Sequence, residues 1–273
     1  MPDLGSDTQT ITRCAARCGW RWWVESLKMI KKAPDSWYLI GLAYSFIHFV
    51  LLIVFNYVFA ASPPSSIWNY IEIFLALLFM PVFMAGFATA GAAQERGGNP
   101  LLSHLFSGFR TRTKRLISIG AIMVAWALII ILTSFFFLSK PRESLFLLHL
   151  LFVFVSFILS ILSWPIIWIA SMMVMFQRVN AGVAIRNSLK AFLINWRAMC
   201  VFFLTLFAGM IAFTFFQVFL FFYEENYSLY IEDYSVITKI PILLLMPILT
   251  SWASLIAYVA YRDIFHAEMP PPP

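Results

Sequence analysis

Residues 81–105 read PVFMAGFATAGAAQERGGNPLLSHL, and residues 165–189 read PIIWIASMMVMFQRVNAGVAIRNSL. Aligned without a gap, the two stretches share three landmarks: Pro81, Gly98 and Leu105 recur as Pro165, Gly182 and Leu189. Each stretch begins inside a long apolar run and leads through a basic amphipathic segment to the next apolar run. Because hydropathy, spacing and turn residues recur together, they predict a chain built from repeated units.

Six long apolar runs account for most of the chain. Hydrophobic residues make up 62% of it and charged residues 12%, about half the charged fraction of a typical soluble domain. Each run reaches the roughly 20 residues that cross a bilayer, and its interior is almost free of charge. The runs cover residues 37–60, 67–93, 116–138, 145–176, 198–222 and 236–261. We therefore predict an all-α polytopic membrane protein with six transmembrane helices in three hairpins.

The distribution of Lys and Arg predicts the orientation in the membrane. Of the 19 Lys and Arg residues, all but Lys140, Arg142 and Lys239 lie in segments that would share one side. The positive-inside rule places that side, and with it both termini, in the cytoplasm. The formal net charge of +6 then reflects topology, and we expect no nucleic-acid partner. Residues 1–35 contain no apolar core, so the first span is expected to direct insertion.

Residues 19–33, GWRWWVESLKMIKKA, are predicted to form a basic amphipathic helix that lies in the membrane interface. Its expected apolar face carries Trp20, Trp23, Val24, Leu27 and Ile30. Its expected polar face carries Arg21, Glu25, Lys28 and Lys32. The aromatic and basic side chains of this helix and of two later ones are candidates for binding lipid or a partner: Trp20, Trp23, Lys28, Lys31, Lys32, Arg110, Arg186 and Lys190.

The two later interfacial helices start near residues 99 and 183. The first opens with Asn99 and Pro100, a favourable cap and first-turn pair. One unit, an interfacial helix followed by a transmembrane hairpin, is thus expected three times, at about 19–93, 99–176 and 183–262. These units would form a single membrane domain, residues 19–262. A cytoplasmic arm, residues 1–18, is expected to be disordered or weakly helical, and residues 263–273 would form a cytoplasmic tail.

Prolines and polar residues inside the spans are candidate functional features. Pro81, Pro165 and Pro247 lie at similar depth in every second span and are predicted to kink their helices. Aligned kinks would favour a cavity or hinge, but prolines are also common in membrane helices, so both interpretations stay open. His48 and Asn56 form a candidate intramembrane polar site, because polar groups are costly there. An interhelical hydrogen bond is the alternative role of His48.

Small residues predict where helices pack closely. Gly86 and Gly91 belong to a small-residue face of the second span. Gly41 and Gly120 are expected to let their hairpins meet the interfacial helices, and Gly209 is expected to form a local packing contact.

No catalytic or metal-binding pattern is present in the sequence. It contains no phosphate loop, nucleophile elbow or HExxH motif, so we predict no catalytic residue, no cofactor and a protein that is not an enzyme. Cys14 and Cys18 share a helical face, but a structural zinc site takes four ligands. No neighbouring Cys or His supplies the others, and we expect no metal site.

Three motifs carry a resemblance to a known family. GWRWWVESLKMIKKAP at 19–34, PVFMAGFATAGAAQERGG at 81–98 and HLFSGF at 104–109 resemble a family of bacterial inner-membrane proteins of unknown function, which has a locus-derived name. The resemblance covers roughly the first 110 residues. The layout is also similar to the membrane domain that accompanies some glycerophosphodiester phosphodiesterases, although no phosphodiesterase domain is present. The resemblance implies six helices in a bacterial inner membrane and supplies no catalytic residue, substrate or cofactor.

Three functions therefore stay open. The basic, Trp-rich helices favour a non-enzymatic scaffold or accessory subunit that binds anionic membrane lipids or a protein partner at the cytoplasmic face. The repeat with aligned prolines is typical of a transporter or channel for a small or amphipathic solute, although no carboxylate lies at mid-depth for ion coupling. A membrane enzyme acting on lipid headgroups could use only Glu95, His104 and the acidic loop expected on the outer side, which carries Glu224, Glu225, Glu232 and Asp233. We favour the scaffold; the solute, partner and oligomeric state are not fixed by the sequence.

Overall fold

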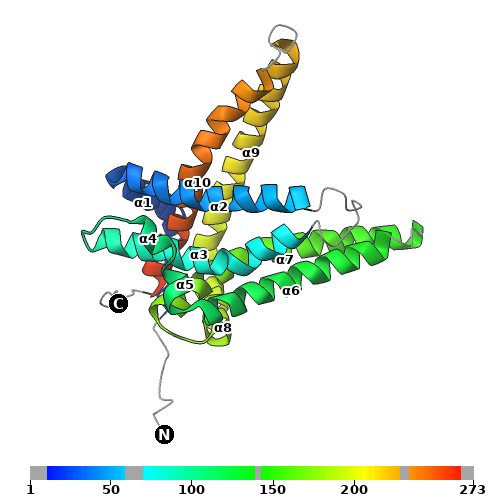
Figure 1. Cartoon of the computed structure of the whole chain (residues 1–273). Coiled ribbons are helices and arrows are strands. Elements are labelled where there is room, and N and C mark those ends of the chain that lie inside the picture. Colours follow the sequence, from blue (N-terminus) through cyan, green and yellow to red (C-terminus); the bar gives the residue numbers. More distant parts are fainter. Residues whose placement is uncertain (1–10, 59–69, 139–142, 228–233, 266–273) are drawn as a thin grey trace. The chain divides into compact units, whose positions relative to one another are not determined.

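The computed structural model describes residues 11–58, 70–138, 143–227 and 234–265 (Figure 1). These residues form helices joined by short connections, and no strand occurs among them. The helices are α1 (Arg17–Lys32), α2 (Pro34–Val58), α3 (Ile71–Glu95), α4 (Leu102–Leu105), α5 (Ser107–Thr111), α6 (Thr113–Leu138), α7 (Glu143–Phe176), α8 (Ala181–Ile194), α9 (Trp196–Tyr227) and α10 (Tyr234–Phe265).

Six of the described helices are long and apolar enough to cross a membrane, which confirms the predicted class and number of spans. The apolar segments are Pro34–Phe55, Ile71–Glu95, Thr113–Phe135, Leu150–Phe176, Trp196–Phe216 and Leu244–Phe265. Their surfaces carry large apolar side chains, among them Leu204, which is 68% exposed, and Phe157, which is 62% exposed. Contiguous apolar surface of this kind is rare on soluble monomers and suits contact with lipid. The chain is a membrane protein.

A single residue separates the first two helices. α1 ends at Lys32, the backbone of Ala33 leaves helical geometry at φ −147° and ψ 62°, and α2 begins at Pro34. Proline is favoured at the first helical position because it lacks an N–H that would have no partner there. Asp35 in the first turn complements the positive end of the helix dipole. The first span therefore begins at Pro34 rather than at residue 37.

The chain divides into two compact units, each built from segments that are distant in sequence. Unit 1 contains Met1–Ser45, Gly91–Leu102 and Ala191–Pro273, and unit 2 contains Phe46–Ala90 and Ser103–Lys190. Unit 1 thus takes the start of the first expected repeat and most of the third, so the unit boundaries do not follow the repeats. Where one interfacial helix was expected after Asn99, the structure has two short helices, α4 and α5.

In unit 1, α1 packs against α9 and α10, and these two helices run side by side (Figure 1). The start of α2 joins them through Gly41. A Cβ at that position would lie 1.9 Å from the carbonyl oxygen of Pro247 in α10, so only glycine allows this approach. Ser251 of α10 donates a hydrogen bond of 2.7 Å to the carbonyl of Trp37. The expectation that Gly41 meets an interfacial helix is therefore wrong; it meets the last span.

In unit 2, α6 and α7 lie side by side (Figure 1), and Trp126 donates a hydrogen bond of 3.2 Å from Nε1 to Ser160 Oγ. The short helices α4 and α5 pack on α3. A Cβ at Gly86 would lie 2.1 Å from the carbonyl oxygen of Leu105, and the rings of Phe83 and Phe109 meet edge to face at 5.2 Å. The small-residue face of α3 thus serves close packing.

Candidate functional site

Helix α1 presents three faces, where the sequence predicted two. The face toward α9 and α10 buries six residues: Cys18, Gly19, Trp22, Ser26, Met29 and Ile30. A second face exposes large apolar side chains, with Trp20 58% and Leu27 37% exposed. The third carries charged residues, and Lys28, Lys31 and Lys32 are exposed. Ile30, which was expected beside Trp20, is buried against the protein instead.

The tryptophans of α1 have different surroundings. Trp23 is half-buried; its ring stacks on Phe202 at 5.6 Å and meets Trp252 edge to face at 5.3 Å. Trp252 in turn donates a hydrogen bond of 2.9 Å from Nε1 to Ser26 Oγ. Trp23 therefore contributes to the packing of unit 1, and of the two predicted tryptophans only Trp20 is freely exposed. Trp22, which the sequence did not single out, is 1% exposed.

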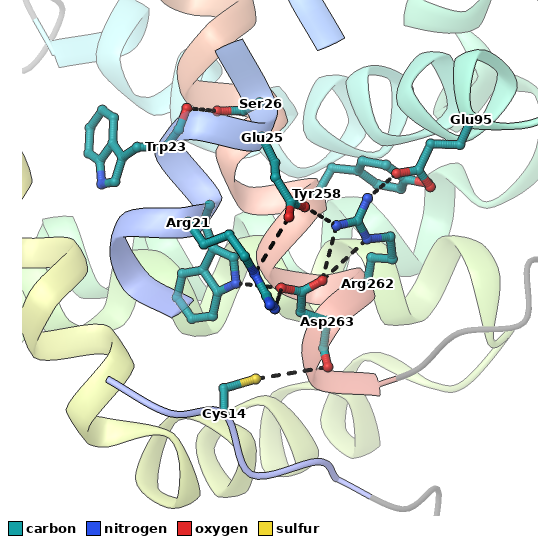
Figure 2. A network of polar contacts seen from close by, with 10 residues as sticks. Cys14, Arg21, Trp23, Glu25, Ser26, Glu95, Tyr258, Arg262 and Asp263 are labelled. Atoms are coloured by element: carbon teal, nitrogen blue, oxygen red, sulfur yellow. Dashed lines mark hydrogen bonds and ion pairs between the residues drawn. The ribbon is translucent and has the colours of Figure 1, made fainter. Parts of the chain in front are cut away.

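A network of charged groups joins α1, α3 and α10 within unit 1 (Figure 2). The guanidinium of Arg262 in α10 lies at its centre and pairs with Glu25 of α1 and Glu95 of α3. It also contacts the neighbouring Asp263 at 3.0 Å. Tyr258, one turn earlier in α10, donates a hydrogen bond of 2.8 Å to Glu95. Glu95 was the candidate carboxylate of a lipid-headgroup enzyme, but here it neutralises a cation.

Asp263 is the second centre of this network. It accepts hydrogen bonds from the guanidinium of Arg21 at 2.7 Å and from Trp22 Nε1 at 3.0 Å (Figure 2). The hydrogen bond and the charge of Asp263 raise the pKa of Arg21. The Asp263 side chain is only 11% exposed, and ionic hydrogen bonds in such surroundings are stronger than those between neutral groups. α10 continues through Asp263 to Phe265, beyond the tail boundary expected at residue 263.

Asn195, between α8 and α9, holds the N-terminal arm. Its Oδ1 accepts a hydrogen bond of 2.7 Å from the Cys14 backbone N–H, and its Nδ2 donates one of 3.1 Å to the Thr12 carbonyl. Thr12 also donates its backbone N–H to the carbonyl of Ile264 at 2.8 Å. These bonds tie the arm to the start of α9 and the end of α10. The expectation of a disordered or weakly helical arm is therefore wrong for residues 12–14.

The thiol of Cys14 is protected in this arrangement. Its Sγ lies 3.9 Å from the carbonyl oxygen of Asp263. Burial, followed by the nearby Cys18 and Asp263, raises the pKa of Cys14 to about 12. Because the thiolate is the nucleophile and the metal ligand, this raised pKa disfavours both roles for Cys14 at neutral pH. Within the part of the chain that the structure describes, no three His, Cys, Asp or Glu side chains are grouped to hold a metal ion.

Helix α8 resembles α1 in what it exposes. It buries the small residues Ala184, Ser188 and Ala191, whereas Leu193 is 60% and Leu189 44% exposed. The predicted basic residues Arg186 and Lys190 are exposed on the same helix, and Arg110 is exposed at the end of α5. A helix that packed only for a soluble core would bury its leucines and expose its serine. α8 therefore presents apolar and basic side chains together.

The predicted intramembrane residues occupy separate places. Pro81, Pro165 and Pro247 are all buried, and α3 and α7 continue through their prolines. The predicted kinks stay predictions. His48 is half-buried in α2, and Asn56 lies later in the same helix with its side chain outside the described part of the chain.

Comparisons with protein-family models, with curated proteins and with solved structures found no match for this chain. The sequence did not predict Arg262, Asp263 and Glu25 of the network as site residues, nor Asn195, which holds the arm. One signal was available: Glu25 is an acidic residue within an otherwise basic segment, which indicates that it pairs with a cation. The sequence does not indicate which arginine pairs with Glu25.

Proposed function

We propose that this protein is a non-enzymatic scaffold or accessory subunit of a bacterial inner membrane, anchored by six spans and by cytoplasmic interfacial helices that bind anionic lipid. The resemblance in the sequence supports the bacterial inner membrane, and the asymmetry of Lys and Arg supports cytoplasmic termini. The order of elements, with a shorter helical segment before each of three pairs of long helices, is consistent with this arrangement.

One observation carries the proposal: α1 and α8 each expose large apolar side chains next to basic ones, Trp20 and Leu27 in α1 and Leu189 and Leu193 in α8. In α1, Trp20 is 58% exposed while Ser26 is fully buried. A helix with an exposed apolar face and adjacent Lys or Arg binds in the interfacial plane of a membrane, where tryptophan is favoured. Each basic residue near an anionic surface contributes about 1 kcal/mol.

The experiment removes the charge of α1 and leaves its packing intact. We expect the triple variant Lys28→Glu, Lys31→Glu, Lys32→Glu, in the full chain, to retain several-fold less phosphatidylglycerol than the parent when both are exchanged into mixed nanodiscs and their bound lipid is quantified. The matched control Lys28→Arg, Lys31→Arg, Lys32→Arg keeps the charge and should retain the parent amount. Equal lipid retention by both variants would contradict the proposal.

The transporter alternative depends on space near the aligned prolines. In unit 1, the carbonyl of Pro247 is in contact with Gly41, so the backbone of α2 fills that position. This contact favours a packed helix pair over a hinge in the last span. A solute-dependent flux by the purified protein in liposomes would favour the transporter instead.

A further inference from the structure

Unit 2 contains a concentrated set of basic residues that no acidic residue accompanies. Its members are Arg110, Arg112, Lys114, Arg115, Arg178, Arg186 and Lys190, hereafter the basic surface. The sequence has no Asp or Glu between Glu95 and Glu143, and none between Glu143 and Glu224. Five of the seven side chains are exposed, and Arg112 and Arg115 are half-buried. Among the described residues, none of these seven cations takes part in an ion pair.

Contacts within unit 2 bring the segments that carry these residues together. Arg115, in the first turn of α6, donates a hydrogen bond to the carbonyl of Arg178, just after α7. Thr111 Oγ1, at the end of α5, lies 3.5 Å from the sulfur of Met175 near the end of α7. Ser188 Oγ of α8 lies 3.6 Å from the sulfur of Met173. The ends of α5 and α7, the start of α6 and the middle of α8 thus meet.

Arg178 is held in place by its own backbone. Its φ of 61° lies in the left-handed region, which residues other than glycine rarely adopt. Because Arg115 binds its carbonyl, this conformation is fixed relative to α6. The backbone of Arg178 is therefore held beside the guanidinium of Arg115, in the first turn of α6. Like charges gathered in this way repel one another unless an anion joins them.

The position of the basic surface along the spans indicates which kind of anion would bind it. α6 enters its apolar segment at Thr113, and α7 leaves its segment at Phe176. With these segments as membrane spans, Lys114, Arg115 and Arg178 would lie at the level of the lipid headgroups. Guanidinium groups bind phosphate oxygens in bidentate fashion. Basic surfaces formed between transmembrane helices at this level suit headgroups with more than one phosphate.

We propose that the basic surface of unit 2 binds the headgroup of a phospholipid that carries two phosphates. A single lipid of this kind would bring two anions to the four converging segments, and a lipid with one phosphate would bring only one. The proposal rests on the proposed function in one respect, since it assumes that the chain binds anionic lipid. Beyond that function, the basic surface would select lipids that carry two phosphates over those that carry one.

The test uses the full chain and an equimolar mixture of phosphatidylcholine, phosphatidylglycerol and diphosphatidylglycerol, with the retained lipids identified by native mass spectrometry. We expect about tenfold preference for diphosphatidylglycerol over phosphatidylglycerol per bound molecule. The triple variant Arg110→Gln, Arg186→Gln, Lys190→Gln should lower that preference to near unity. All three side chains are exposed on helices, so the variant should elute as the parent does in size-exclusion chromatography.

The matched control removes the same number of charges from α1 with Lys28→Gln, Lys31→Gln and Lys32→Gln. It should lower retention of both anionic lipids and leave the preference between them unchanged. Retention of both anionic lipids without preference would overturn this inference while the proposed function stands. Retention of neither would overturn both. An acidic protein that copurifies in fixed ratio, and is lost only from the unit 2 variant, would also overturn it by identifying a protein ligand.

Discussion

In unit 1, Arg21 and Arg262 lie among the carboxylates of Glu25, Glu95 and Asp263. In unit 2, the seven basic side chains of the basic surface have no acidic residue in the same stretches of sequence. By composition alone the two regions look alike, since both would be counted as evidence for a cytoplasmic side. The structure separates them. In unit 1 the charges of Arg21 and Arg262 join segments of the chain to one another, and in unit 2 the charge of the basic surface stays available to an external anion.

The comparison has an energetic consequence. A partly buried cation that is already paired gains little from a lipid phosphate, because it already donates its hydrogen bonds to carboxylates of the protein. An exposed and unpaired cation costs the fold almost nothing when it is removed. Variants of the paired Arg21 and Arg262 in unit 1 should therefore change stability, and variants of the basic surface in unit 2 should change ligand binding.

The largest effect is expected from Arg262→Gln. It leaves Glu25 and Glu95 without the cation that neutralises them, and removal of one member of a buried pair costs about 3 kcal/mol. The Arg262 side chain is 30% exposed, so we place the cost at the lower end of the range for such pairs. The measurement is thermal unfolding of the purified protein in detergent. Arg110→Gln in unit 2 is the control and should shift the midpoint hardly at all; similar shifts in both variants would break the comparison.

Both units contain a glycine that closely approaches the backbone of another helix, and we expect an alanine there to lower stability. Gly41→Ala in unit 1 would place a methyl group 1.9 Å from the Pro247 carbonyl oxygen, and Gly120→Ala in unit 2 would place one 2.1 Å from that of Leu78. Because backbone cannot move aside as a flexible side chain can, each should cost about 2 kcal/mol. A Cβ at Gly209 would meet no heavy atom within 4 Å, so Gly209→Ala should leave the stability unchanged. Thermal unfolding checks all three, and an unchanged Gly41→Ala protein would exclude the α2–α10 contact.

The class of the protein and the number of spans could be predicted because both depend on the sum of side-chain hydropathy along one segment. The existence of α1 followed from its periodicity. The face that it buries did not, because Trp20, Trp22 and Trp23 surround the helix and periodicity alone cannot tell which apolar side meets protein. That choice depends on α9 and α10, whose residues lie more than 150 positions away.

The contacts of the candidate site were less predictable for the same reason. Arg262 and Glu25 are 237 positions apart, and the sequence holds no local sign that they meet. Gly41 and Gly120 were recognised as positions of close approach, but the expected neighbours were interfacial helices and the observed ones are spans. For Gly209 the expected packing contact is wrong, since nothing lies within reach of a Cβ there.

A smaller loss of stability is expected from Asn195→Ala. The change removes two hydrogen bonds to the arm and leaves the Cys14 N–H and the Thr12 carbonyl without this partner, at a cost of about 1–2 kcal/mol. Asn195→Asp keeps the acceptor for Cys14 but not the donor for Thr12, and should lie between the parent and Asn195→Ala. The arm is observed through the rate at which Cys14 is alkylated at pH 8. Equal rates in all three proteins would show that Asn195 does not hold the arm.

The last effect is absent at neutral pH and appears only in alkaline solution. Burial, Cys18 and Asp263 raise the pKa of Cys14 from 9.0 to about 12, so the folded protein favours the neutral thiol. The corresponding stability is fully present below pH 9 and is lost as the pH rises from 9 toward 12, because the unfolded chain releases this proton first. The rate of Cys14 alkylation by iodoacetamide, followed by mass spectrometry, should therefore keep rising beyond pH 10. A peptide of residues 11–18 should reach half its maximum near pH 9, and a folded protein that matched the peptide would contradict the structure.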